Sequence, residues 1–129
     1  MNEEIRKLLG IFKKYPEIKL VYLFGSRVKG KAGPMSDYDF AIYLDTPDKK
    51  KIFNIKIELL NQLSQSLKTD KVDVMILNTT ESPELKFNVI NEGKLIFERE
   101  PFKILIEPKI LNEYFDFRTM LLKHNLTRA

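Results

Sequence analysis

The sequence predicts an α/β (α+β) fold in which about four strands form one mixed sheet, with helices packed mainly on one face of it. Short apolar runs alternate with amphipathic segments along the whole chain, which is the main support for this class. The 129 residues are 43% hydrophobic and 31% charged, a composition typical of a globular chain with one core. Without a repeat or an obvious linker, we expect a single domain over residues 1–129, with its central part at about 18–98 and a helical extension at about 101–125.

The first third of the chain predicts one helix and two strands. Residues 2–14 place their apolar side chains on one helical stripe, and Pro16 ends that helix. Residues 18–25, IKLVYLFG, form a nearly continuous apolar run, which is typical of a central strand covered on both faces. Residues 37–44, DYDFAIYL, alternate between the two faces of a strand, with the large apolar side chains on one of them.

The middle of the chain predicts a long helix and a third strand. Thr46 is expected to cap the helix and Pro47 to occupy its first position, because proline there loses no hydrogen bond. Apolar residues recur at helical spacing up to Leu67. Residues 71–78, KVDVMILN, alternate again and read as a strand.

The last third predicts a short helix, a fourth strand and a C-terminal helix. Ser82 and Pro83 begin the short helix, and Gly93 closes it. Residues 94–98, KLIFE, form the fourth strand, and residues 108–124 carry an apolar stripe at helical spacing.

Charge, cysteine content and hydropathy exclude several classes of protein. The formal net charge of +4 is mild and typical of a lysine-rich surface, so we expect no direct binding of nucleic acid. The chain has no cysteine, which excludes disulfides and thiolate zinc sites. No apolar run approaches the ~20 residues that span a bilayer, and the first residues, MNEEIRKLLGIF, contain acids and no signal-like apolar segment. We therefore expect a cytoplasmic protein without membrane contacts.

Two aspartates one residue apart are the first candidate site. Asp37 and Asp39 project from the same face of their predicted strand, roughly 6 to 7 Å apart along it. The opposite face is apolar and is expected to meet the helices, so the carboxylates look toward solvent or a cleft. Paired carboxylates on an open face suit a hard divalent cation, above all magnesium.

A third acid and a Gly-Ser pair extend this site. Asp73 lies on the polar face of the next main strand and joins the pair if the two strands are neighbours. Three carboxylates on adjacent strands can hold two metal ions for phosphoryl-type chemistry. Gly25 lets a ligand approach the backbone closely, and Ser26 offers a hydroxyl and a helix N-terminus to an anion.

The segment LFGSRVKGKAGPMSDYDFAIYL resembles the Gly-Ser…Asp-X-Asp signature of the DNA polymerase beta-like nucleotidyltransferase superfamily. Within it, the chain is most similar to the minimal nucleotidyltransferase (MNT) group, whose members are often antitoxins of HEPN-domain ribonuclease toxins. The resemblance covers roughly residues 21–98 and implies the nucleotidyltransferase fold. It also implies transfer of AMP from ATP, with release of pyrophosphate, to a hydroxyl, expected to be a tyrosine, of a HEPN toxin partner.

The resemblance also implies roles for individual residues. Asp37 and Asp39 would hold two magnesium ions, and Asp73 would bind the metal nearer the nucleophile and help to deprotonate the acceptor hydroxyl. Gly25 and Ser26 would hold the triphosphate, and Arg27 would touch phosphate or brace the loop.

Two other functions remain open from the sequence. The domain could silence a toxin by masking it, without catalysis, or transfer a nucleotide to a small-molecule hydroxyl such as that of an aminoglycoside. The chain has little beyond the expected catalytic sheet, which weighs against a built-in acceptor site and favours a partner protein. The apolar C-terminal stretch ILNEYFDFRTMLL is a candidate docking helix, with packing inside the domain as the alternative.

Overall fold

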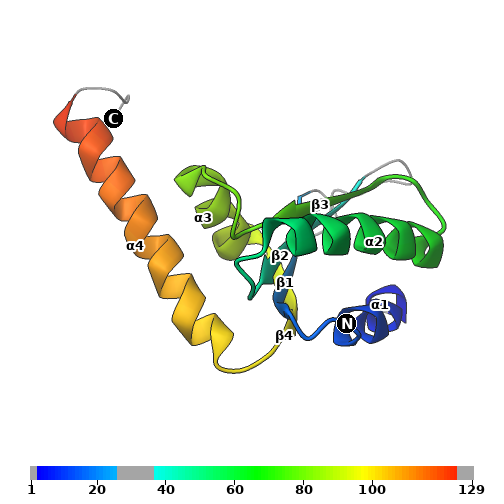
Figure 1. The fold of residues 1–129 in the computed structure, drawn as a ribbon. Helices are drawn as coiled ribbons and strands as arrows, with labels where there is room; N and C mark the ends of the chain where they lie inside the picture. Colours follow the sequence, from blue (N-terminus) through cyan, green and yellow to red (C-terminus); the bar gives the residue numbers. More distant parts are fainter. Residues whose placement is uncertain (1–2, 26–36, 125–129) are drawn as a thin grey trace.

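The computed structural model describes residues 3–25 and 37–124, and in this part of the chain four helices alternate with the strands of one sheet (Figure 1). The elements are, in order, α1 (Glu3–Lys13), β1 (Ile18–Phe24), β2 (Tyr38–Leu44), α2 (Lys49–Leu67), β3 (Val72–Ile76), α3 (Pro83–Glu92), β4 (Lys94–Glu98) and α4 (Phe102–Lys123). All the predicted strands are present, and β4 has the predicted bounds. None of the described helices is long and apolar enough to cross a lipid bilayer.

The sheet is mixed, as predicted, with the strand order β3-β2-β1-β4. β1 pairs antiparallel with β2 and with β4, whereas β2 pairs parallel with β3. The near-continuous apolar run of β1 therefore belongs to an inner strand, and its side chains are buried on both faces.

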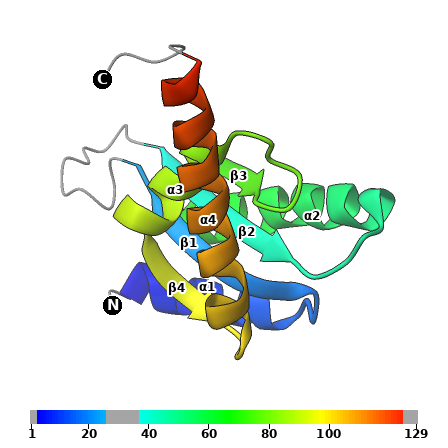
Figure 2. The same cartoon turned by 90° about the vertical axis from the view of Figure 1, so that its left-hand side faces the viewer.

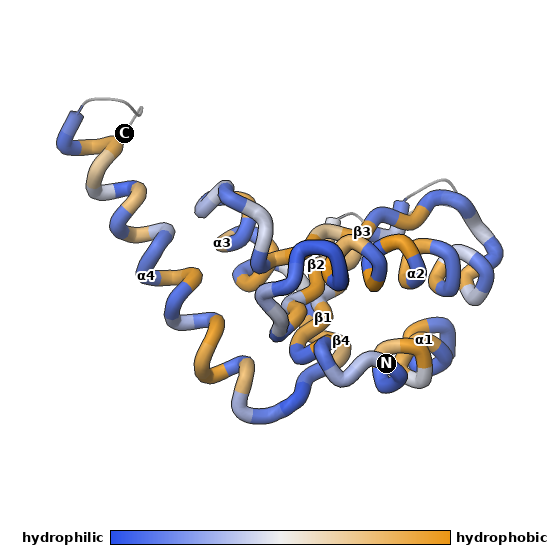
Figure 3. Tube along the Cα trace, in the orientation of Figure 1, coloured by the Kyte–Doolittle hydropathy of each residue, from blue (hydrophilic) through white to orange (hydrophobic). Residues whose placement is uncertain are grey.

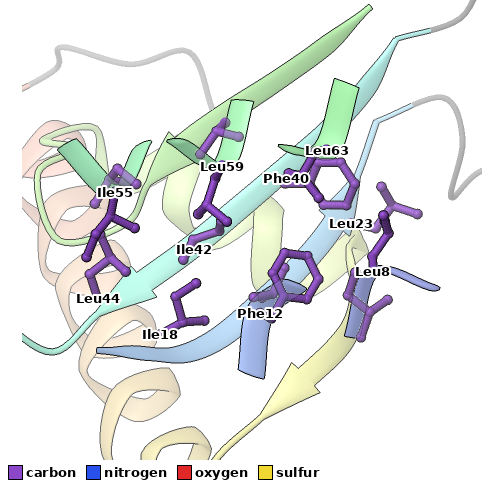
Figure 4. Close-up of a cluster of buried hydrophobic side chains, with 14 of the residues drawn as sticks. Leu8, Phe12, Ile18, Leu23, Phe40, Ile42, Leu44, Ile55, Leu59 and Leu63 are labelled. Atoms are coloured by element: carbon purple, nitrogen blue, oxygen red, sulfur yellow. The ribbon is translucent and has the colours of Figure 1, made fainter. Parts of the chain in front are cut away.

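The larger core lies between the sheet and the helices α1 and α2. Figure 4 shows Leu8 and Phe12 of α1 and Leu63 of α2 gathered around Phe40 of β2. The rings of Phe12 and Phe40 meet edge to face, with 6.2 Å between centroids.

The other face of the sheet is covered as well, which differs from the expectation that helices pack mainly on one face. Leu20 and Tyr22 of β1 form a second core with Val89 of α3 and Ile110 of α4. Alternation along β1 sends apolar side chains to both faces, so each face needs a cover to exclude water. The fold class is confirmed, with two helices on each side of the sheet in the described part of the chain.

Helix α2 begins two residues later than predicted. Its N-cap is Asp48 rather than Thr46, because the Asp48 carboxylate accepts hydrogen bonds from the amides of Lys50 and Lys51, at 3.0 and 3.3 Å. The Thr46 hydroxyl instead accepts a bond from the amide of Asp48, which orients the capping residue.

Helix α4 begins at Phe102, six residues before the predicted start at Pro108, which lies inside the helix. Pro108 forfeits one backbone hydrogen bond, but Ile106 and Ile110 on either side of it are buried in the second core. Burial of these two side chains thus offsets the cost of a proline, so the helix continues past a residue that normally ends one.

The outer half of α4 extends away from the sheet beyond α3 (Figures 1 and 2). The ring of Phe87 on α3 stacks on that of Tyr114 on α4 at 4.0 Å, and Lys86 forms an ion pair with Glu113 at 2.9 Å. Apolar positions continue along this half of α4 in Figure 3, and Phe115 is among those left exposed.

Candidate active site

Asp39 of β2 lies on the face of the sheet opposite the larger core. Tyr38 and Phe40 point into that core, so Asp39 between them points to the other face. Asp39 is half-buried, while Asp37, immediately before the strand, is exposed.

Asp73 is the direct neighbour of Asp39 in the sheet. In the parallel ladder of β2 and β3, Asp39 is paired with Asp73 and Phe40 with Val74. Adjacent strands lie about 4.8 Å apart, so the two carboxylates stand side by side on one face. The condition attached to Asp73 in the sequence, that its strand should neighbour the aspartate strand, is therefore met.

Gly25, the residue directly after β1, lies next to the Asp39 carboxylate. Its φ of +85° lies in the region that residues with a side chain avoid. A Cβ at this position would lie only 2.6 Å from Oδ2 of Asp39, so the Gly25 backbone packs directly against that carboxylate. The sequence predicted close approach to a ligand here, and the structure shows close approach to the aspartate itself.

Ser26 and Arg27 lie outside the described residues. Their assignment to triphosphate binding stays a prediction from the Gly-Ser motif and its resemblance.

The carboxylates repel one another. The pKa of Asp39 is raised, first by burial and then by the negative charges of Asp73 and Asp37. A bound cation would relieve this repulsion and favour the ionised carboxylate.

Two hollows meet at Asp73. One, of about 420 Å³, is lined by Asp39, Asp73 and Lys56 together with Phe24, Val74, Met75 and Leu85. The second, of about 450 Å³, is lined by Asp37, Asp73 and residues 70–72. The acidic side chains therefore border open space in which a ligand can reach them, whereas a larger hollow of about 600 Å³ lies between the end of β4 and α4, lined by other residues.

The donor set fits magnesium in type. Asp39 and Asp73 supply carboxylate oxygens in one hollow, and Mg²⁺ is commonly held by one or two carboxylates together with substrate phosphates. Within residues 3–25 and 37–124, no three His, Cys, Asp or Glu side chains are grouped closely enough to hold an ion by themselves. The pair of Asp39 and Asp73 is thus what the fold brings together, with Asp37 lining the neighbouring hollow.

Lys56 is a candidate site residue that sequence reasoning missed. It lies on α2, at the border between the buried stripe and the exposed side, and it lines the hollow with Asp39 and Asp73. A helical projection of α2 could have shown that Lys56 lies next to the buried face of the helix. It could not have shown that this side of the helix lies near the aspartates.

A curated relative of this chain is the protein adenylyltransferase MntA of Aphanizomenon flos-aquae (strain 2012/KM1/D3). The two are 30% identical over 107 residues, which cover 74% of this chain and 67% of the relative. This similarity agrees with the resemblance to minimal nucleotidyltransferases.

Solved structures share the fold. One chain from the crystal structure of a toxin-antitoxin with AMP-PNP superposes with a TM-score of 0.73 at 29% identity, covering 95% of this chain and 94% of that one. A second comes from the structure of the tri-AMPylated Shewanella oneidensis HEPN toxin in complex with MNT antitoxin, with a TM-score of 0.70 and 24% identity, covering 93% and 91%. At that identity the second likeness shows a common fold alone.

The sequence also matches a protein family as a whole. Residues 6–102 match the family described as "Polymerase beta, Nucleotidyltransferase". The matched stretch runs from α1 to the first residue of α4 and contains Gly25 and the three aspartates. The chain belongs to the polymerase beta-type nucleotidyltransferase family.

Proposed function

We propose that this protein is a magnesium-dependent adenylyltransferase that moves AMP from ATP to a tyrosine hydroxyl of a HEPN toxin and thereby acts as its antitoxin. Membership of the nucleotidyltransferase family supports the reaction class, and the similarity to MntA supports a protein as the acceptor. The chain that is 29% identical comes from a toxin-antitoxin structure with AMP-PNP, which supports a toxin as the partner, and an MNT antitoxin of the same fold was found in complex with a tri-AMPylated HEPN toxin.

The observation that carries the proposal is the pairing of Asp39 with Asp73 against the backbone of Gly25. The parallel register brings the two carboxylates to neighbouring positions. The backbone of Gly25 packs so closely against Asp39 that an added Cβ would clash with Oδ2 of that residue. Placing like charges side by side without a function costs stability, so such a cluster is typical of a site that binds cations.

The transfer is a single displacement at the α-phosphorus of ATP. The oxygen of the acceptor hydroxyl forms a new bond to that phosphorus, and the bond to the oxygen bridging toward the β-phosphate breaks. Pyrophosphate leaves with the electron pair of the broken bond, and the hydroxyl loses its proton.

Asp37, Asp39 and Asp73 would hold two magnesium ions, which when bound supply the positive charge that stabilises the α-phosphate and the leaving pyrophosphate. Asp73, at the edge of the sheet next to the open hollow, is assigned to receive the proton of the acceptor hydroxyl. The Gly25 backbone, with Ser26 and Arg27 after it, is assigned to the triphosphate. Positioning and charge stabilisation then account for catalysis, because the protein forms no covalent intermediate.

The proposal is tested by the intact mass of the HEPN partner after incubation with this protein, ATP and magnesium. We expect a gain of one or more AMP units, lost with Asp37→Asn, Asp39→Asn or Asp73→Asn and lost when a chelator removes the metal. Asp45→Asn is the matched control, because Asp45 is also exposed but lies just beyond the other end of β2. It should leave the gain in mass unchanged.

Two results would replace the proposal. If the partner gains no mass but is still silenced in a tight complex with the Asp39→Asn protein, the domain acts by masking. If labelled AMP passes to a small-molecule hydroxyl and not to the partner, the acceptor is a small molecule.

A further inference from the structure

One flank of helix α2 is left uncovered by the other elements of the described structure. It carries Lys49, Phe53, Lys56 and Ile57, spaced at i, i+4, i+7 and i+8 and therefore on one side of the helix, and we refer to these four as the α2 strip. Phe53 is 61% exposed and Ile57 is 47% exposed. Large apolar side chains adjoining one another at the surface often mark an interaction site.

The orientation of α2 turns this strip toward the catalytic hollow. The opposite flank meets α1 and the turn after it, where the Tyr15 hydroxyl donates to Glu58 at 2.9 Å and accepts from Gln62 at 2.7 Å. The strip accordingly lies on the side of β3, the outermost strand, beside which α2 runs in Figure 2. Lys56 reaches the hollow that contains Asp39 and Asp73.

An exposed apolar side chain borders this hollow from the other face of the sheet. Leu85, in the first turn of α3, is 39% exposed and lines the hollow together with Lys56. The α2 strip and Leu85 thus flank the opening in front of the aspartates, along the outer edge of β3, which pairs with no further strand of the described residues.

The two lysines of the strip have no ion-pair partner among the described residues. Lys51, on the α1 side of the same helix, forms an ion pair with Glu17 at 2.6 Å, whereas Lys49 and Lys56 form no ion pair with residues in the described ranges. Two cations interleaved with two apolar side chains complement a segment that carries carboxylates and apolar side chains.

We propose that the α2 strip and Leu85 form the docking surface for the acceptor polypeptide and select a hydroxyl flanked by acidic and apolar side chains. This inference rests on the proposed function, since it assigns a substrate preference to the same site. The occupant must bring its hydroxyl to Asp73, and Lys56 of the strip lines the same hollow as Asp73. Lys56 acts as a positioning residue, and Phe53, Ile57 and Leu85 bury the apolar neighbours of the acceptor.

The test is the steady-state rate of AMP transfer to the HEPN partner, with KM measured separately for partner and for ATP. Phe53→Ser combined with Ile57→Ser should raise the KM for the partner about tenfold, as loss of a buried apolar anchor does, and leave kcat and the KM for ATP within about twofold of wild type. Lys49→Gln combined with Lys56→Gln should weaken the rise of the partner KM with ionic strength, because fewer charges are then screened. Circular dichroism spectra and melting temperatures check that the variants fold.

The control is Lys103→Gln combined with Ile104→Ser on α4, where a lysine also adjoins an apolar side chain, one that is 77% exposed. An unchanged partner KM in this control, with a raised KM in the strip variants, supports the proposal. A raised KM in the α4 control and a normal one in the strip variants overturns it and moves the acceptor surface to α4. If wild-type protein transfers no AMP, the proposed function fails, and binding of the partner is then measured by calorimetry. Weaker binding in the strip variants alone supports the strip as the docking surface. Unchanged binding in the strip variants overturns it.

Discussion

Replacing Gly25 with alanine tests the corner of the site where backbone meets carboxylate. The new Cβ would lie 2.6 Å from Oδ2 of Asp39, well inside van der Waals contact, so the carboxylate or the end of β1 must move. The backbone φ of +85° is also unfavourable for alanine. Both effects act on the aspartate that stands beside Asp73.

The expected magnitudes follow from these two effects. An alanine held in a left-handed conformation costs about 1–2 kcal/mol, and with the displaced carboxylate we expect a total loss of about 1–3 kcal/mol in the free energy of unfolding. A displacement of about 1 Å in a catalytic group can lower the rate of transfer about 100-fold. Activity should therefore fall much more than stability.

The assay combines kcat for AMP transfer with thermal unfolding of the Gly25→Ala protein. Gly10→Ala in α1 is the matched control, because a Cβ there meets no atom within 4 Å and alanine favours the helix by about 0.5–1 kcal/mol. The control should keep full activity and melt slightly higher. Wild-type kcat and melting temperature in Gly25→Ala would show that the close packing against Asp39 is not needed.

Three further predictions concern stability. Tyr22→Phe removes the hydroxyl that donates to Glu107 at 2.6 Å across the second core, and urea unfolding should show a loss of about 1–2 kcal/mol because the carboxylate loses a partly buried donor. Asp48→Ala removes the N-cap of α2 and should cost about 0.5–2 kcal/mol in the same assay. The Lys51 hydrogen bond is the largest influence lowering the pKa of Glu17 below its ordinary value of 4.5, so this pair stabilises the fold above that pH and its contribution fades as the pH falls through the lowered pKa. Lys51→Met should thus be less stable than wild type at pH 7, and the two urea midpoints should converge in acid; a constant difference down to pH 2 would contradict the assignment.

Local patterns in the sequence determine the strands and the faces on which their side chains lie. The alternation in DYDFAIYL places Phe40 inside and Asp39 on the other face, and KLIFE becomes β4 with the predicted bounds. These features depend on backbone periodicity and on the burial of apolar side chains, both of which are visible over a few residues. The Gly-Ser…Asp-X-Asp spacing likewise indicates the family, which the comparisons confirm.

Helix boundaries were harder to predict from the sequence than strands, because contacts with neighbouring elements in the fold determine where a helix begins and ends. Asp48 caps α2 in place of Thr46, two candidates that sequence alone ranks nearly alike. Pro108 sits inside α4 because Ile106 and Ile110 gain burial against the sheet, a gain that no local propensity contains.

The composition of the candidate site was decided by long-range pairing. A strand pattern says which face Asp73 occupies but not which strand lies beside it, and only the parallel register of β2 and β3 sets Asp73 next to Asp39. The packing of Gly25 against the Asp39 carboxylate and the reach of Lys56 from α2 into the same hollow depend on contacts between segments distant in sequence. The sequence by itself thus determined which residues are candidates for the chemistry, and the tertiary structure determined which of them meet, because contacts between distant segments follow from the packing of the whole chain.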